Sequence, residues 1–379
     1  MNANRGPAEL PSPEPQALAA SRALLERIGA ELAAAGNWIS FARYMELALH
    51  EPGLGYYAGG ARKFGAGGDF VTAPELSPLF GRALARQIAE LLQPGEAVLE
   101  FGAGSGALAE ILISELPDVK YEILETSSEL RQRQAHRLGN RVQWLDQLPH
   151  NFRGVMLANE VVDAMPVHAL AWTRTGILER GVCANEGQLA WSDRAADNSI
   201  VAGSREIEIE LPPSGRYESE LALFARAWMR SLARFLSRGA ILVVDYGFPR
   251  REYFHPQRSM GTLACHYRHR MHGDPFYLPG LQDITAHVDF SALARAAGDA
   301  GLALLGYANQ AQFLVNCGIT DLLAREDPSD AKRYLPAAAA AQKLLSPAEM
   351  GELFKVLAVG KGVPRPLLGF SSGDRAHAL

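Results

Sequence analysis

The stretch VLEFGAGSGAL, from Val98 to Leu108, constrains the fold of this chain more than any other feature. An apolar strand pattern leads into a run of small residues, and a helix pattern follows at once. Such a turn lets the backbone approach a bound nucleotide cofactor closely, because glycine has no side chain to fill the space. The stretch therefore predicts an α/β nucleotide-binding fold.

Two cofactor motifs fit this turn. Gly102, Gly104 and Ala107 satisfy the dinucleotide pattern G-x-G-x-x-G/A. Gly102, Gly104 and Gly106 also fit the acid-x-G-x-G-x-G turn of S-adenosylmethionine (SAM) enzymes, with Glu100 as the acid. The turn alone leaves both cofactors open.

Apolar strand patterns and helix patterns alternate along the chain around this turn. Continuous apolar strands separated by helices favour a parallel sheet that is covered on both faces. Ser77 followed by Pro78 predicts the start of a helix, and Trp144 and Tyr246 are expected in the core. The predicted strands are 97–101, 121–125, 141–145, 154–160 and 240–247.

Two segments interrupt the alternation. REIEIEL, at 205–211, alternates strictly and predicts a strand, which with 169–191 would form an antiparallel insertion that is solvated on one face. A helix is predicted from about 218 to 236. The second segment, 248–290, is polar and aromatic, and connections of such length are commonly functional. The predicted organisation is a disordered tail (1–16), an N-terminal helical and lid segment (17–93), a core (94–362) with insertions at about 169–212 and 248–290, and a C-terminal tail (363–379) that is frayed from Ser371.

Composition excludes several classes of function. The chain has 37 basic and 42 acidic residues, a net charge of −5 that gives no overall attraction to nucleic acid. No apolar run approaches membrane-spanning length, and the Pro-rich N-terminus lacks the hydrophobic segment of a signal peptide. An odd, scattered set of cysteines argues against a disulfide framework and for a reducing compartment, so we expect a cytoplasmic protein. The cysteines are Cys183, Cys265 and Cys317.

Residues outside the turn favour SAM. Glu125 ends the predicted second strand, 21 residues after Gly104, where a carboxylate takes the ribose hydroxyls in either cofactor fold. Glu100 lies inside an apolar strand, where an unpaired carboxylate is unfavourable, so it should have a hydrogen-bonding task. A SAM turn uses an acid at this place, whereas a dinucleotide fingerprint does not need one. We therefore predict SAM as the cofactor.

A polar cluster, in NEVVDAMP, follows the fourth predicted strand at the edge where α/β folds bind ligands. Asn159, at the strand end, is assigned to the cofactor site. Glu160 and Asp163 either cap a helix start or form a carboxylate clamp on a cationic substrate such as arginine. We favour the clamp, with Glu160 as the first candidate for proton acceptor and Asp163 as the second.

Further polar stretches supply candidate lid and substrate residues. GDFVTAPELSPLFG is more polar than a linker needs, so it is either a capped loop or a lid over the cofactor carboxylate. CHYRH lacks a convincing second pair of metal ligands, and we predict no metal site. DITAHVDF alternates and predicts a short strand with one polar face. The candidates are Asp69, Thr72, Pro74, Glu75, His266, His287 and Asp289.

This ordered series of motifs resembles the MidA-type family of SAM-dependent methyltransferases. The resemblance covers roughly 39–362 and rests on ISFARYMELALHEPGLGYY, GDFVTAPELSPLFG, LEFGAGSG, NEVVDAMPVH, VVDYGF, GTLACHYRH, DITAHVDF and MGELFKVL. It implies a Rossmann-like, seven-stranded methyltransferase core with an N-terminal helical and lid extension and an antiparallel β insertion. It also implies cofactor contacts at Gly102, Gly104, Glu125 and the neighbourhood of Asp146. Mitochondrial members of the family are complex I assembly factors that act as protein arginine methyltransferases.

We therefore expect direct methyl transfer from SAM to a nitrogen nucleophile, with a protein as the substrate and arginine as the acceptor. In-line positioning is the main task of such an enzyme, because the methyl group is already activated. A guanidinium has a pKa above ~12, so a carboxylate must accept its proton as the new bond forms. The alternatives are a methyltransferase for a small molecule or another side chain, and a non-catalytic protein that binds SAM and a partner. The sequence specifies no oligomeric state.

Overall fold

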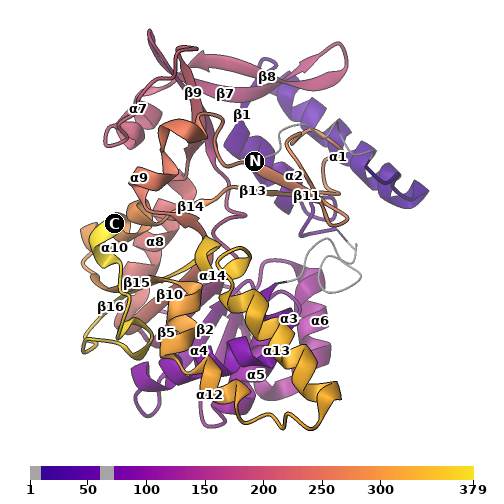
Figure 1. Ribbon diagram of the computed structural model, residues 1–379. Helices are drawn as coiled ribbons and strands as arrows, with labels where there is room; N and C mark the ends of the chain where they lie inside the picture. Colours follow the sequence, from indigo (N-terminus) through magenta and orange to yellow (C-terminus); the bar gives the residue numbers. More distant parts are fainter. Residues whose placement is uncertain (1–9, 60–71) are drawn as a thin grey trace. The chain divides into compact units, whose positions relative to one another are not determined.

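The structure is a computed structural model that describes residues 10–59 and 72–379. Contacts between Cα atoms divide these residues into two compact units (Figure 1). Unit 1 contains the described residues up to 59 together with 164–224 and 251–287, and unit 2 contains 72–163, 225–250 and 288–379.

Unit 2 is built around a mostly parallel sheet with the order β15-β16-β10-β5-β2-β3-β4. The strands from β10 to β4 are parallel, while β16 pairs antiparallel with both β10 and β15. A short eighth strand, β14 (Val288–Asp289), pairs with the end of β10. The other strands are β2 (Ala97–Phe101), β3 (Lys120–Leu124), β4 (Gln143–Leu145), β5 (Phe152–Asn159), β10 (Leu236–Phe248), β15 (Ala303–Asn309) and β16 (Phe354–Lys361). The predicted α/β class with a Rossmann-like core is confirmed.

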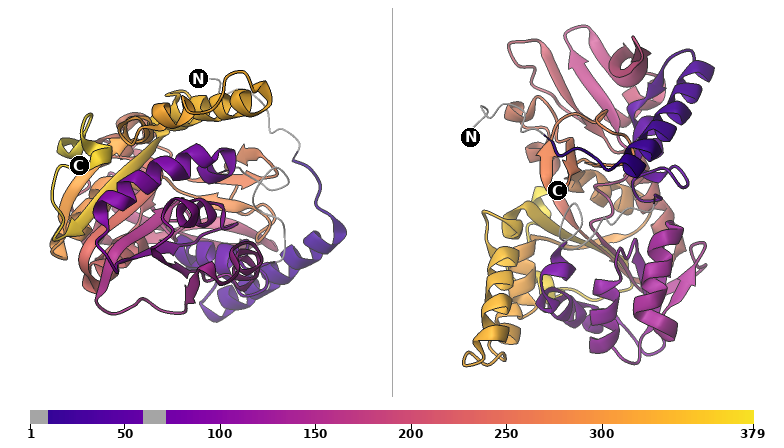
Figure 2. Two further views of the ribbon diagram at one scale, coloured as in Figure 1. Left: turned by 90° about the horizontal axis from the view of Figure 1, so that it is seen from below. Right: turned by 90° about the vertical axis from the view of Figure 1, so that its right-hand side faces the viewer.

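Helices cover both faces of this sheet, as the continuous apolar strands require. Val98 of β2 and Val155 of β5 belong to a core shared with helices α4, α5, α11, α12 and α13. On the opposite face, Phe101 meets Trp228 of α8 edge-on, with ring centroids 5.4 Å apart. Figure 2 gives two further views of the ribbon, with helices of unit 2 beside its strands. The helices in or bordering unit 2 are α3 (Ala73–Leu76), α4 (Pro78–Leu91), α5 (Ala107–Glu115), α6 (Ser128–Leu138), α8 (Leu223–Phe235), α10 (Phe290–Asp299), α11 (Gln310–Asn316), α12 (Ile319–Leu323), α13 (Ala331–Leu345) and α14 (Met350–Leu353).

Unit 1 contains two antiparallel sheets and the N-terminal helices. The larger sheet has the order β1-β7-β6-β9, with β8 paired to β7, and the smaller has the order β12-β11-β13. Residues of the two N-terminal helices and of both sheets share one hydrophobic core, which includes Leu24, Phe41, Val182 and Cys265. The elements are α1 (Pro15–Ala34), β1 (Ile39–Ser40), α2 (Phe41–His50), β6 (His168–Thr173), β7 (Gly176–Asn185), β8 (Gln188–Ala195), α7 (Asn198–Ser204), β9 (Arg216–Leu221), α9 (Arg250–Tyr253), which borders unit 2, β11 (Ala264–Tyr267), β12 (Arg270–His272) and β13 (Asp283–Thr285).

The strand predicted at 205–211 is wrong. The chain leaves α7 there without regular structure, and the strand that pairs with β6 is β9, at Arg216–Leu221. Because β7 occupies the other edge of β6, the alternating segment has no free edge of that strand to join. The helix predicted from about 218 begins later, at Leu223, because the residues up to Leu221 belong to strand β9.

The two units divide the chain in their own way: residues 164–224 and 251–287 belong to unit 1, and the predicted N-terminal segment is shared between the units. The predicted boundaries of the insertions stay predictions. The C-terminal tail is packed: Leu367 and Phe370 are buried, and the Arg375 amide donates to the Tyr307 carbonyl at 2.6 Å. Residues 1–9 of the predicted disordered tail lie outside the described residues. Within the described ranges, no helix has both the length and the hydropathy needed to cross a bilayer.

Candidate functional site

The glycine turn follows β2 at the carboxyl edge of the parallel strands. The order of these strands reverses between β2 and β5, which is the point where open α/β sheets bind ligands. Gly102, Gly104 and Gly106 have φ angles of 56°, 55° and 79°, a region that L-residues with a side chain rarely adopt. A Cβ atom on Gly102 would also lie 3.3 Å from Val161. The backbone of this turn therefore requires glycine.

Glu125 follows β3 directly, and both of its carboxylate oxygens accept hydrogen bonds. Oε1 accepts from the Ser127 amide and Oε2 from the Gln134 side chain, both at 2.9 Å. Gln134 also donates to the Gly104 carbonyl at 3.0 Å. The predicted ribose-binding carboxylate thus lies beside the glycine turn, connected to it through one glutamine.

Glu100 is buried on β2, with 3% of its surface exposed. The Tyr121 hydroxyl donates to its carboxylate at 2.7 Å, so the acid has the hydrogen-bond partner that the sequence predicts. Burial raises the pKa of Glu100 to about 7, the Tyr121 bond opposes this rise, and the nearby charge of Glu125 adds to it. Glu100 therefore changes protonation near neutral pH.

The acidic cluster lies at the carboxyl ends of β5 and β10. Glu160 has a φ of 53°, unusual for a residue with a side chain. Its Oε1 accepts from the Asn159 side chain at 3.3 Å and from the Ala73 amide at 3.4 Å. Asp163 is 6% exposed and accepts a hydrogen bond from the Tyr246 hydroxyl. The structure thus brings the predicted clamp residues into one part of unit 2.

Sequence reasoning did not select two members of this cluster, Asp245 and Tyr246. Asp245 is fully buried; its Oδ2 accepts from the amides of Val162 and Asp163 at 2.9 and 3.2 Å, and its Oδ1 from the Tyr246 amide at 2.9 Å. Burial raises its pKa well above the usual range, and the charges of Asp163 and Glu160 raise it further. The sequence did contain a signal for Asp245: it is an acid at the end of the apolar run AILVVD, and Glu100 was identified by the same kind of pattern.

Part of the predicted lid contacts the same region. The Ser105 hydroxyl, in the glycine turn, donates to the Glu75 carboxylate, and Arg137 lies 3.9 Å from that carboxylate. Pro74 is in α3 and Thr72 immediately precedes it. Asp69 lies outside the described residues. The segment therefore both leads into the Ser77-capped helix α4 and connects the glycine turn to Glu160.

The other candidates lie in other parts of the chain. Asp146 is exposed after β4 and pairs with Arg131 at 2.6 Å. His266 and His287 belong to unit 1, and their predicted contact with the substrate stays a prediction. Asp289 caps α10 by accepting from the Ala292 amide at 3.0 Å, and its predicted contact with the substrate stays a prediction.

The single strand predicted over DITAHVDF is also wrong. Asp283–Thr285 form β13 in the three-stranded sheet, whereas Val288–Asp289 form β14 beside β10. The chain passes from one unit to the other between these strands. A common polar face is therefore lost, although the sequence alternates without a break.

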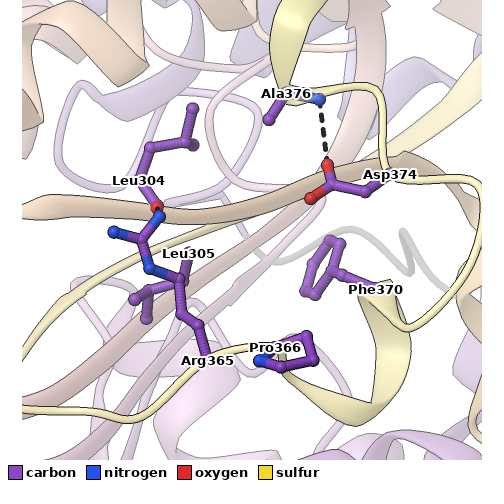
Figure 3. Close-up of a pocket in the computed structure, with 7 residues that line it drawn as sticks. All are labelled: Leu304, Leu305, Arg365, Pro366, Phe370, Asp374 and Ala376. Carbon is purple, nitrogen blue, oxygen red and sulfur yellow. Dashed lines mark hydrogen bonds between the residues drawn. The ribbon is translucent and has the colours of Figure 1, made fainter.

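A pocket of about 330 Å³ lies elsewhere in unit 2, between β15 and the C-terminal segment (Figure 3). Arg365 donates to the Leu304 carbonyl at 2.6 Å, and Asp374 accepts from the Ala376 amide at 2.9 Å. None of the predicted site residues lines this pocket. It adjoins an antiparallel edge strand, away from the carboxyl ends of the parallel strands.

The residues around the glycine turn fit an adenosyl cofactor. The glycines of the turn place no side chain between its backbone and a ligand, and the Glu125 carboxylate beside the turn is an acceptor of the kind that ribose hydroxyls need. Asn159 Oδ1 is buried, and no donor among the described residues reaches it. In the same ranges, no group of three or more His, Cys, Asp or Glu side chains is arranged to hold a metal ion.

Comparisons with known proteins agree with this cofactor. A model of the family described as "Putative S-adenosyl-L-methionine-dependent methyltransferase" matches residues 79–308. A Burkholderia thailandensis protein, described as a "likely methyl transferase" and solved with S-adenosyl-homocysteine bound, is 51% identical. It superposes with a TM-score of 0.93 over 98% of this chain and 100% of that one. SAM is therefore the cofactor, and the protein is a SAM-dependent methyltransferase.

Curated relatives extend the comparison and correct one prediction. The mitochondrial protein arginine methyltransferase NDUFAF7 of Danio rerio is 31% identical over 89% of this chain and 87% of its own. The NDUFAF7 homolog of Drosophila melanogaster is 27% identical over 96% and 92%. Both are named mitochondrial, which contradicts the expected cytoplasmic location. The cysteine pattern indicated a reducing compartment, but it does not distinguish one reducing compartment of the cell from another.

The family model and the similar solved structure together cover most of the chain. The matched family residues contain the glycine turn, Glu125 and the acidic cluster. The similar solved structure covers both units, insertions included. The chain belongs to the MidA-type family of SAM-dependent methyltransferases.

Proposed function

We propose that this methyltransferase acts on an arginine side chain of a protein partner. The acidic cluster of Glu160 and Asp163, together with Asp245 and Tyr246, is the observation that carries the proposal. A cluster of carboxylates at the ligand-binding edge suits a cationic acceptor, and bidentate contacts to carboxylates align a guanidinium. Relatives about 30% identical are named protein arginine methyltransferases. The family resemblance makes a respiratory complex I subunit the first substrate to test.

The residues of the chain divide the work between cofactor and acceptor. When bound, SAM supplies a methyl group that is already activated on its sulfonium. The glycine turn, Glu125 and Asn159 hold the cofactor, with Glu125 accepting from the ribose hydroxyls. Glu160 and Asp163 bind the guanidinium and orient the attacking nitrogen, which is the main source of rate enhancement.

Proton acceptance falls to Glu160 in this proposal. Asp163 already accepts a bond from Tyr246, whereas the bonds to Glu160 from Ala73 and Asn159 are long, at 3.4 and 3.3 Å. Both oxygens of Asp245 accept from backbone amides, which gives this carboxyl a structural task and leaves Glu160 and Asp163 as the candidates for contact with the acceptor. Glu160 then takes the proton that the guanidinium loses as its nitrogen is methylated.

Glu160→Gln tests the proposal, because it preserves the shape of the side chain while removing its charge and its proton-accepting site. The substrate is lysate from a strain lacking the protein, incubated with methyl-labelled SAM, and labelled residues are identified by mass spectrometry. The rate should fall by roughly 10²–10⁴, the usual contribution of a general base. Affinity for S-adenosylhomocysteine (SAH) should be unchanged.

The control for this substitution is Glu115→Gln, at the exposed end of α5, where Glu115 pairs with Arg82 at 3.3 Å. That variant should methylate at the wild-type rate. Labelled arginine in wild type and its loss in Glu160→Gln support the proposal. Label in a small molecule or another side chain, or a Glu160→Gln variant as fast as wild type, would reject it.

A further inference from the structure

Gln134 makes three hydrogen bonds that join three separate cofactor-site segments. It lies on α6 and is fully buried, with 0% of its surface exposed. Its Nε2 donates to the Gly104 carbonyl at 3.0 Å and to Glu125 Oε2 at 2.9 Å. Its Oε1 accepts from Trp144 Nε1, on β4, at 3.0 Å. One side chain therefore connects the turn after β2, the acid after β3 and strand β4.

Trp144 determines which way the glutamine amide points. An indole N–H can only donate, so Oε1 of Gln134 must face Trp144. The NH₂ group must then face Gly104 and Glu125, which are both acceptors. The opposite amide orientation would oppose donor to donor at Trp144 and acceptor to acceptor at Glu125. The observed orientation is thus the only one that satisfies all three partners.

This arrangement orients the Glu125 carboxylate. Ser127 donates to one of its oxygens and Gln134 to the other. Without Gln134, the second oxygen would lose a donor that holds the carboxylate beside the Gly104 carbonyl. Preorganisation of this kind reduces the ordering that binding would otherwise require.

We propose that Gln134, oriented by Trp144, is a positioning residue that sets recognition of the cofactor ribose through Glu125. The inference rests on the ribose contact assigned to Glu125 in the proposed function, and it does not depend on the identity of the methyl acceptor. Gln134 has no exposed surface, so in this proposal it acts through Glu125.

The test compares two ligands, SAH and its 2′-deoxy analogue, by titration calorimetry. Wild type should prefer SAH by roughly 10- to 100-fold, the range expected for a hydrogen bond to a charged group. Glu125→Ala should abolish most of that preference. Gln134→Met removes both donors and should bring the preference within about threefold of the Glu125→Ala value.

Two other variants address folding and general destabilisation. Trp144→Phe removes the indole donor and should reduce the preference in the same direction, even where Gln134→Met does not fold. Gln87→Met is the matched control, because Gln87 is also fully buried in unit 2. Its side chain donates to Glu90 at 2.8 Å and accepts from the Gly369 amide at 2.7 Å. This control should lose stability yet keep the wild-type preference.

The outcomes distinguish the ribose contact of Glu125 from the positioning role of Gln134. A preference that survives in Glu125→Ala would show that the ribose contact lies elsewhere, and would reject the proposal with it. A preference lost in Glu125→Ala but kept in both Gln134→Met and Trp144→Phe would leave the ribose contact standing and overturn the positioning role. Where Gln134→Met does not fold, Trp144→Phe alone decides. Equal losses of both ligands at constant preference would indicate a merely structural glutamine.

Discussion

Glycine conformation is the feature of single residues that most limits change at the cofactor site. Gly104 has a φ of 55° and its carbonyl accepts from Gln134. Any side chain here strains the backbone, and a β-branched one most of all.

Gly104→Val should therefore abolish SAH binding in a chain that still folds. Gly102 and Gly106 also have positive φ angles. The turn therefore cannot move by a few residues to restore SAH binding. Titration calorimetry measures the affinity, and circular dichroism with urea unfolding verifies the fold. The matched control is Gly95→Ala, also at positive φ (82°) with open space around it. A Gly104→Val protein that binds SAH like wild type would contradict the assignment.

A second expectation at this scale concerns Glu100 and pH. Its pKa is about 7 in the folded chain, against 4.5 for an ordinary glutamic acid. Between these values the folded state holds a proton that the unfolded state has released. The free energy of unfolding therefore falls as pH rises through this window, by up to on the order of 3 kcal/mol above pH 7.

Glu100→Gln removes this titration. Compared with wild type, the variant should gain stability steadily from pH 5 to pH 8 when both are measured by urea unfolding without cofactor. Tyr121→Phe, which removes the hydrogen bond that lowers the pKa, should make the pH dependence steeper. Curves of wild type and Glu100→Gln that stay parallel across this range would disprove the raised pKa.

Helices of this chain begin at the capping residues that the sequence predicts, whereas the pairing of its strands depends on the topology of the sheets. The Ser77 side chain accepts from the Leu79 amide at 3.2 Å and caps α4, as the Ser-Pro pair predicts. Asp289 does the same for α10 and also lies 3.4 Å from Arg250. A residue predicted to contact the substrate therefore also caps a helix, and the two roles can be told apart by measurement.

Asp289→Ala should lower the free energy of unfolding by about 1 kcal/mol, the usual contribution of an N-cap. Asp289→Ser retains a capping oxygen and should recover most of that loss. Both variants should methylate at the wild-type rate once scaled to folded protein. A large fall in methylation with unchanged stability would instead place Asp289 in the reaction.

At the scale of the whole molecule, the N-terminal helices and the two insertions form one body. Ile39 pairs with Val182, and Cys265 with Ile284, and all four side chains belong to the same core. The sequence suggested an extension and two separate insertions. Their common core depends on contacts between residues more than a hundred positions apart, which no local pattern contains.

What the sequence by itself determined is the local framework of the methyltransferase core. The apolar pattern predicts β2 and α5, the glycine motif predicts the turn between them, and the strand pattern predicts an acid after β3. Each of these features depends only on residues that are close in the sequence. The positions of Glu100 and Glu160 followed from the same logic, since polar groups that interrupt or end buried strands need partners.

Only the tertiary structure decided which segments pair and which side chains meet. Residues 205–211 alternate like a strand but have no partner, and 216–221 pair with β6. Trp144 and Tyr246, expected only in the core, donate to Gln134 and Asp163. Strand pairing and side-chain hydrogen bonds join residues distant in sequence, so their free energy depends on the path of the chain, whereas local periodicity reports only which faces are buried.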